Sequence, residues 1–238
     1  MDLKIKDVAE LLNVSETTIR RWLNEGKIPA YRLHHQYRFS RIEIENWMLS
    51  CRLKGESEQE QIYPVKEAES EEGHTRKGMQ QFSLYRAIHR GGIIPNMLSE
   101  SKEEIIRETM KHIGPHLGLD PDGISELLLD RENLMPTALN NGIAVPHTRD
   151  FLLKKPYDVV SVVTLRQPVD WGALDGKPVH TLFFLFATND KRHLHLLAKL
   201  AHLSSNDEMI ELLRSNVDKD ELLEQIKVWE GKVRHLSE

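Results

Sequence analysis

A histidine at the end of an apolar run is the residue of this chain best suited to covalent chemistry. The run Gly142-Ile143-Ala144-Val145 leads through Pro146 to His147. Proline fixes the backbone just ahead of the imidazole, an arrangement typical of a side chain that is presented rather than buried. Because a neutral imidazole nitrogen is both a nucleophile toward phosphorus and a leaving group, a histidine in the position of His147 can carry a phosphoryl group reversibly.

A phosphohistidine is a dense anion, so it needs cations or oriented N–H donors nearby. Arg131 offers a planar fork of donors. His193 falls in the first turn of a helix that Asp190 is expected to cap, where positive partial charge accumulates. Two plainer interpretations stay open, namely a surface ion pair for Arg131 and an exposed turn for His193.

The elements around these residues alternate between strands and helices. Strands are predicted at 157–165 and 179–187, with a hairpin turn at Asp175-Gly176 before the second, which is apolar on both faces and therefore central. A helix is predicted to begin after Ser101 and to stop at Gly114-Pro115. Interleaving on this scale predicts an α/β layer architecture.

The remaining histidines are predicted to hold no metal. His193 and His195 are two residues apart on one helix, where side chains diverge by about 100° per step. His112 and His116 flank Gly114-Pro115, which is expected to break the helix that a histidine pair would need. No metal site is therefore expected at these histidines.

The start of the chain has the pattern of two short helices and a strand pair. Apolar residues recur at helical spacing over 5–12, and Ser15 offers an N-cap to a second helix. Short strands are predicted at 31–33 and 37–39, and Ser40 begins a third helix. This order is typical of a winged helix-turn-helix.

Basic and small polar side chains on the second helix suit the major groove of DNA, and those on the strands could hold phosphates. The predicted DNA-contacting residues are Thr17, Thr18, Arg20, Arg21, Asn24, Arg32, Tyr37 and Arg38. An alternative is that the basic residues only solubilise a small domain used for protein contacts.

The net charge of −5 hides an uneven distribution along the chain. Six basic and two acidic residues lie between Glu16 and Arg41, whereas seven glutamates and one lysine lie between Gly55 and Gly73. The acidic stretch is poor in apolar residues and is predicted to be a linker, with a solvated helix as the alternative. We therefore expect a DNA-binding domain over 1–53, a linker over 54–78 and a second domain over 79–238.

Composition excludes several classes of protein. Apolar residues at 39% and charged residues at 29% argue against wholesale disorder or a disulfide scaffold. Cys51 is the only cysteine, and no apolar run approaches the ~20 residues of a membrane-spanning helix. We expect a cytoplasmic protein without membrane insertion.

The strings Arg131-Glu132-Asn133-Leu134-Met135-Pro136-Thr137-Ala138-Leu139 and Gly142-Ile143-Ala144-Val145-Pro146-His147 resemble the active-site region of fructose/mannitol-type enzyme IIA domains, including the nitrogen-regulatory branch. These domains belong to the phosphoenolpyruvate-dependent sugar phosphotransferase system. The resemblance implies a mixed sheet flanked by helices, no cofactor, phosphorylation of His147 by phospho-HPr, and site roles for His193 and Arg131. Thr148 departs from the small residue that is common there.

Residues 1–50 resemble the excisionase-like helix-turn-helix family related to MerR regulators. The resemblance rests on Val8-Ala9-Glu10-Leu11-Leu12-Asn13-Val14-Ser15, Thr18-Ile19-Arg20-Arg21-Trp22, Gly26-Lys27-Ile28-Pro29-Ala30, Arg38-Phe39 and Trp47. It implies DNA as a partner, and because such proteins often bind DNA as dimers, a homodimer is left open. The wing turn differs, with His34-His35-Gln36 where glycine and arginine are usual.

Together these features predict a regulator in which the phosphorylation state of His147 changes DNA binding by the N-terminal domain. Two alternatives belong to other classes of function. In one, the chain passes phosphate to a sugar-specific IIB partner for transport. In the other, the IIA-type domain regulates a target protein by binding it, without contact to DNA.

Overall fold

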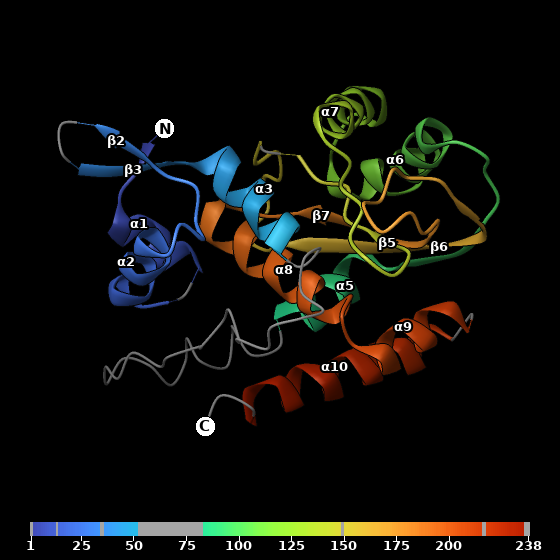
Figure 1. Ribbon diagram of the computed structural model, residues 1–238. Coiled ribbons are helices and arrows are strands. Elements are labelled where there is room, and N and C mark those ends of the chain that lie inside the picture. The colour runs from blue at the N-terminus through green and yellow to red at the C-terminus, as the bar shows by residue number, and fades with distance from the viewer. Residues whose placement is uncertain are drawn as a thin grey trace.

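The computed structural model describes residues 2–12, 14–33, 36–51, 83–148, 150–215 and 218–235. Figure 1 shows a small N-terminal unit beside a larger sheet with helices on both faces. The predicted linker over 54–78 lies outside the described residues, so the predicted domain boundaries stay a proposal. Along the described parts of the chain, no helix combines the length and the apolar character needed to cross a membrane.

Over its described residues, the N-terminal unit contains three helices and a three-stranded antiparallel sheet in the order β1-β3-β2. Its elements are β1 (Asp2–Leu3), α1 (Ile5–Leu12), α2 (Glu16–Asn24), β2 (Tyr31–Leu33), β3 (Gln36–Ser40) and α3 (Arg41–Cys51). Ser15 caps α2 as predicted, because its Oγ accepts a hydrogen bond from the Thr18 amide at 3.1 Å. Ile19 and Trp22 lie on the apolar face of α2 and are buried in the core. The predicted helix-turn-helix order is confirmed, while His34 and His35 lie outside the described residues.

The larger region is built on a four-stranded mixed sheet in the order β4-β6-β7-β5. Its strands are β4 (Ile93–Met97), β5 (Ile143–Ala144), β6 (Val159–Val169) and β7 (Val179–Phe186). The two central strands, β6 and β7, are antiparallel, and each has a parallel neighbour on its other side. Seven of the eight residues of β7 are buried, which confirms the predicted central position.

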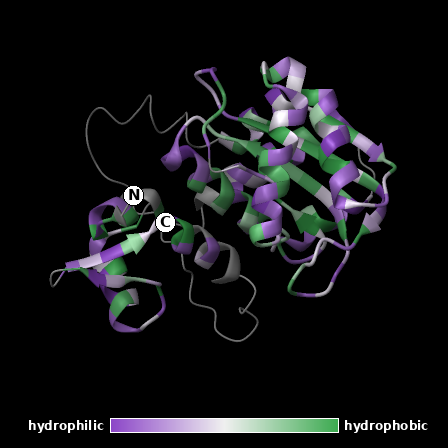
Figure 2. Ribbon diagram, turned by 90° about the horizontal axis from the view of Figure 1, so that it is seen from above, coloured by the Kyte–Doolittle hydropathy of each residue, from purple (hydrophilic) through white to green (hydrophobic). Residues whose placement is uncertain are grey.

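Helices cover both faces of this sheet. They are α5 (Ser83–Gly91), α6 (Lys102–Leu117), α7 (Pro121–Leu134), α8 (Asp190–Leu203), α9 (Asp207–Arg214) and α10 (Lys219–His235). One apolar cluster joins the sheet to α5, α8, α9 and α10, and a second joins it to α6 and α7. Figure 2 shows hydrophobic residues concentrated along the strands between these two layers. The predicted fold class, a mixed sheet flanked by helices, is confirmed.

The predicted end of the first helix of this region is wrong. α6 continues through Pro115 to Leu117 and ends at Gly118, whose left-handed φ of 73° allows its amide to bond the carbonyls of Gly114 and Pro115. Proline in the last turn removes one backbone donor, and burial of Leu117 favours continuing the helix past it.

His112 and His116 therefore share one helix, contrary to the expectation that Gly114-Pro115 separates them. His112 lies 3.4 Å from Glu108 on the exposed face of α6. In the ranges that the structure describes, no group of three or more histidine, cysteine, aspartate or glutamate side chains is arranged to hold a metal ion.

Candidate functional site

The structure brings the two histidines that the sequence singles out into contact. His147 follows β5 and pairs with Leu185 of β7 in a parallel bridge, so the sheet fixes its backbone. His193 lies in the first turn of α8. The two imidazole rings are 5.0 Å apart between centroids and meet edge to face at 77°. A strand end and a helix start far apart in the sequence therefore build one site.

The hydrogen bond of His147 defines which of its ring nitrogens can react. Nδ1 lies 2.7 Å from the carbonyl oxygen of Val145. A carbonyl oxygen only accepts hydrogen bonds, so Nδ1 carries the proton and Nε2 of the neutral ring carries the lone pair. Nε2 is therefore the ring nitrogen of His147 that can act as a nucleophile.

Both histidines are buried, which contradicts the expectation that proline presents the imidazole at the surface. His147 is 0% exposed and His193 is 1% exposed, and the Nε2 atoms of both rings are shielded from solvent. The reason is tertiary: the strand-like segment that ends at His147 runs beside β7, and α8 closes over its end. Proline fixed the local backbone but did not determine what packs against the ring.

The start of α8 positions His193. Asn189, not the predicted Asp190, is the N-cap, since its side chain accepts from the Arg192 amide at 3.0 Å and its carbonyl accepts from the His193 amide at 2.9 Å. The sequence allowed either residue because both are good caps. Asp190 is the first residue of α8, and its carboxylate forms a salt bridge with Arg41 instead of capping the helix.

A buried carboxylate that sequence reasoning missed anchors the same helix start. Asp158, the residue before β6, accepts hydrogen bonds from the Thr188 amide and hydroxyl at 3.0 Å and from Arg192 Nε at 2.6 Å. These bonds tie the first turn of α8, and therefore His193, to the central sheet. A lone aspartate before an apolar strand gives no signal of this role in the sequence.

Arg131, the third predicted site residue, lies at the C-terminal end of α7 and is buried. Its Nη1 donates to the Met135 carbonyl at 2.9 Å. The next residue, Glu132, accepts from the amide of Thr137 at 3.0 Å and from its hydroxyl. The Thr137 carbonyl accepts from the Val145 amide at 3.0 Å.

These bonds form a continuous path from α7 to the acceptor histidine, because the Val145 carbonyl in turn holds His147 Nδ1. Burial raises the pKa of Glu132, while the bonds from Thr137 and the positive charges of Lys102 and Arg131 oppose that rise. Of the Arg131-Glu132 pair, Glu132 thus supports the backbone of the segment that ends at His147.

We expect Glu132→Ala to lower the free energy of unfolding by about 3 kcal/mol, because it leaves two buried donors of Thr137 without their acceptor. Glu132→Gln keeps one oxygen for the Thr137 amide and is expected to cost less. Urea unfolding followed by circular dichroism measures both. Equal stability of the alanine variant and the wild-type chain would contradict a bracing role.

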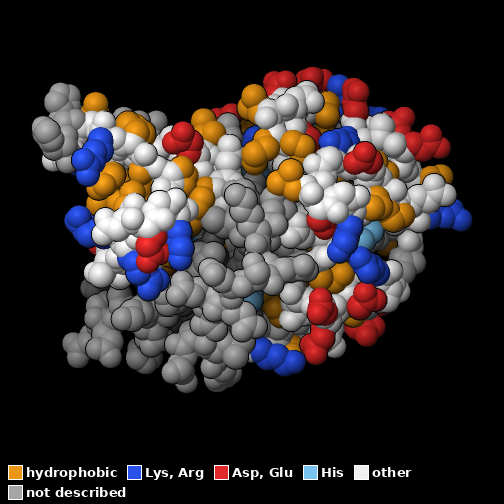
Figure 3. Space-filling view, in the orientation of Figure 1, with side chains coloured by type: hydrophobic (Ala, Val, Ile, Leu, Met, Phe, Trp, Pro, Cys, Tyr) orange, Lys and Arg blue, Asp and Glu red, His pale blue; other side chains and the backbone are white. Residues whose placement is uncertain are grey.

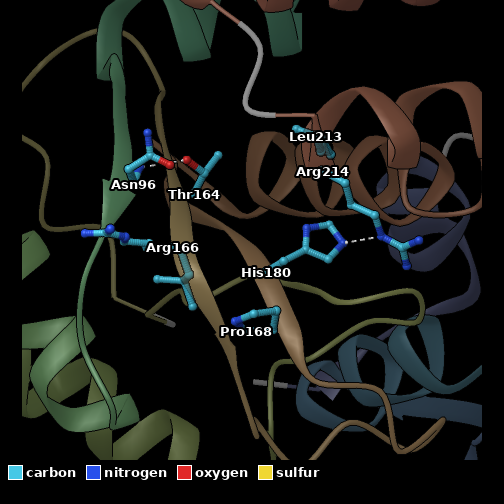
Figure 4. A pocket seen from close by; sticks show the side chains of 8 residues that line it. Asn96, Thr164, Arg166, Pro168, His180, Leu213 and Arg214 are labelled. Carbon is cyan, nitrogen blue, oxygen red and sulfur yellow. Dashed lines mark hydrogen bonds between the residues drawn. The ribbon is translucent and has the colours of Figure 1, made fainter.

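A separate cleft of about 670 Å³ lies at the other end of β7, with Asn96, Arg166, His180 and Arg214 among its lining residues. His180 sits near the start of β7, whereas Leu185, the partner of His147, is near its end. Figure 4 shows the side chains of Arg166 and Arg214 extending away from one another on opposite sides of His180. Burial lowers the pKa of His180. Among the described residues that line this cleft, none is a predicted site residue.

Most of the predicted DNA-contacting residues of α2 are on the surface of the N-terminal unit. Thr17, Arg20, Arg21 and Asn24 are exposed, and Arg20 makes an exposed ion pair of 3.7 Å with Glu16. Thr18 is half-buried, and its hydroxyl lies 2.9 Å from that of Ser15 at the helix cap. Lys and Arg side chains appear at several points on the face of this unit shown in Figure 3.

The predicted wing residues interact with one another on β2 and β3. Arg32 donates to the Tyr37 hydroxyl at 3.0 Å and stacks over its ring at 4.9 Å. Arg38 donates to the Tyr37 carbonyl at 3.0 Å and to the Gln36 side chain at 2.8 Å. These contacts orient both guanidinium groups on the strand pair.

Residues 87–228 match the family described as "Phosphoenolpyruvate-dependent sugar phosphotransferase system, EIIA 2", and residues 3–52 match a helix-turn-helix domain. The chain belongs to the EIIA 2 family and carries an N-terminal helix-turn-helix domain.

Among its relatives are two nitrogen regulatory proteins. That of Pseudomonas aeruginosa is 34% identical over 135 residues, which are 56% of this chain and 86% of the relative. That of Escherichia coli K12 is 32% identical over 135 residues, which are 56% of this chain and 82% of the relative. The crystal structure of nitrogen regulatory protein IIA-Ntr from Neisseria meningitidis aligns with a TM-score of 0.54 and 29% identity over 60% of this chain and 98% of that one.

Proposed function

We propose that this chain is a regulatory protein of the phosphotransferase system, in which His147 accepts a phosphoryl group from phospho-HPr and this state controls DNA binding by residues 1–53. The observation that carries the proposal is the hydrogen bond from His147 Nδ1 to the Val145 carbonyl, with His193 in ring contact. It holds one tautomer and leaves Nε2 as the reacting atom. A cytoplasmic location is part of the proposal.

In the proposed transfer, His147 Nε2 attacks phosphorus and forms an N–P bond while the N–P bond to the donor histidine breaks. No oxidation occurs, and the electron pair of the broken bond returns to the donor imidazole. The proton on Nδ1 stays with His147, and the Val145 carbonyl stabilises the positive charge that the ring acquires. His193 contributes a ring N–H donor at the positive end of α8, and Arg131 contributes positive charge at the end of α7.

For the N-terminal domain, the proposal rests on the exposed basic and polar side chains of α2 over a buried apolar face. A helix of this kind can enter the major groove, with Arg20 and Arg21 reaching base edges or phosphates. The strand pair with Arg32 and Arg38 would contact the adjoining backbone.

We expect the affinity for DNA to change by at least about fivefold when the chain is phosphorylated, the lower end of typical coupling between two sites. A phosphoryl group adds about −1.5 to −2 charges, which alters both repulsion from DNA and contacts between domains. Fluorescence anisotropy with a DNA ligand selected from a random pool measures this change. Identical affinity before and after phosphorylation would contradict coupling, and His147→Ala, incubated in the same way, is the control.

A further inference from the structure

The N-terminal unit packs directly on the helix that carries His193. Both α1 and α3 contact α8, and Figure 1 shows α3 lying beside it. Leu194 is 1% exposed and belongs, with half-buried Ala198, to the same apolar cluster as Val8 and Ile44 of the N-terminal unit. Two residues of α8 therefore complete the core of the helix-turn-helix unit.

Arg41, the first residue of α3, extends this contact to the histidine site. Its Nη1 forms a salt bridge of 2.7 Å with Asp190, which precedes His193 by three residues and so shares its face of α8. The Arg41 guanidinium also lies 5.2 Å from the centre of the Phe151 ring. Phe151 meets His193 edge to face at 6.5 Å, and His193 meets His147 at 5.0 Å.

We propose that the N-terminal unit, held on α8 by Arg41, is a removable cover over the phosphoacceptor site and competes with the phosphoryl donor for this face. The proposal rests on the function proposed above. In-line transfer requires the donor phosphorus within about 3.5 Å of the attacking nitrogen. His147 Nε2 is shielded from solvent, and the N-terminal unit reaches its ring neighbour His193 through Arg41 and Phe151, so we expect release of this unit to be part of opening the site to a donor.

The DNA-facing side of the unit takes no part in this cover. Arg20 on α2 keeps 62% of its side chain exposed in the docked arrangement, whereas the contacts with α8 come from α1 and α3. Docking and DNA binding therefore use different surfaces. By linkage, a condition that strengthens docking slows phosphorylation, and a bound donor favours release of the unit.

The first test measures access to the histidines without any donor protein. Diethyl pyrocarbonate modifies accessible imidazoles, and mass spectrometry of the full chain gives the rate at each histidine. We expect His147 and His193 to react on the order of tenfold faster in Arg41→Ala, the effect of losing one charge-assisted contact. Exposed His112 is the internal reference and should react equally in all variants.

The second test measures initial rates of labelling by enzyme I, HPr and phosphoenolpyruvate. Arg41→Ala should be labelled faster than the wild-type chain. Ala198→Glu, which places a charge in the apolar contact without altering Arg41, should be labelled faster too. Lys27→Ala removes one charge from an exposed position paired with Glu25 and should leave the rate unchanged.

If both Arg41→Ala and Ala198→Glu are labelled at the wild-type rate or more slowly, the proposal that the N-terminal unit covers the site is wrong. A slower rate in Arg41→Ala alone would instead make this arginine an aid to transfer, which also overturns it. Failure of the proposed function gives a different result, in which no variant is labelled at all, while the modification rates still report whether the site is covered.

Discussion

Replacement of His147 by alanine is expected to abolish transfer of phosphate from phosphoenolpyruvate to this chain through enzyme I and HPr. In the proposed transfer we expect His147 Nε2 to form the new bond, because Nδ1 is hydrogen-bonded to the Val145 carbonyl at 2.7 Å. His193 does not replace it, since its ring is placed by α8 rather than by the segment that follows β5. Labelled phosphoenolpyruvate with detection of protein-bound phosphate is the measurement.

The matched control is His112→Ala, which removes an exposed imidazole from α6 and should be labelled like the wild-type chain. Circular dichroism should show both variants folded. The label should be stable in alkali and lost in acid, as expected of a phosphoramidate rather than a phosphate ester. Undiminished labelling of His147→Ala would contradict the assignment of His147 as the acceptor.

The double variant Arg20→Ala plus Arg21→Ala is expected to weaken DNA binding on the order of a hundredfold at low salt, since each specific arginine contact contributes about 1–3 kcal/mol. Both side chains are exposed on α2, so their removal leaves the core formed by Ile19 and Trp22 intact. The logarithm of affinity should also depend less steeply on salt, with a slope shallower by up to about 2.

Lys111→Ala plus Lys227→Ala removes the same charge from exposed positions on α6 and α10 and serves as the control. It should leave DNA affinity within about twofold of wild type, because charges beyond a Debye length are largely screened. If the wild-type chain binds no DNA even at low salt, the helix-turn-helix unit acts through protein contacts instead. Equal losses in both double variants would indicate a general charge effect.

Local features of the fold were predictable from the sequence because short-range chemistry produces them. Ser15 and Ser101 cap their helices through side-chain bonds to an amide three residues on. The apolar run that forms β7 is buried on both faces, as its pattern predicts. Two local predictions were wrong: α6 continues past Gly114-Pro115, where burial of Leu117 favours the longer helix, and Asn189 rather than Asp190 caps α8.

The sequence by itself determined the family and the helix-turn-helix order, and it indicated His147 as the candidate acceptor, because all three inferences depend on residues close together in the chain. Only the tertiary structure decided that His147 is buried, that its Nδ1 is occupied, and that Arg41 and Asp190 join the N-terminal unit to α8. The ion pair joins residues 149 positions apart, and the burial of His147 depends on β7 and α8, which follow it in the chain. Hydrophobic burial sets which elements meet, and a local pattern carries no information about the partner that covers it.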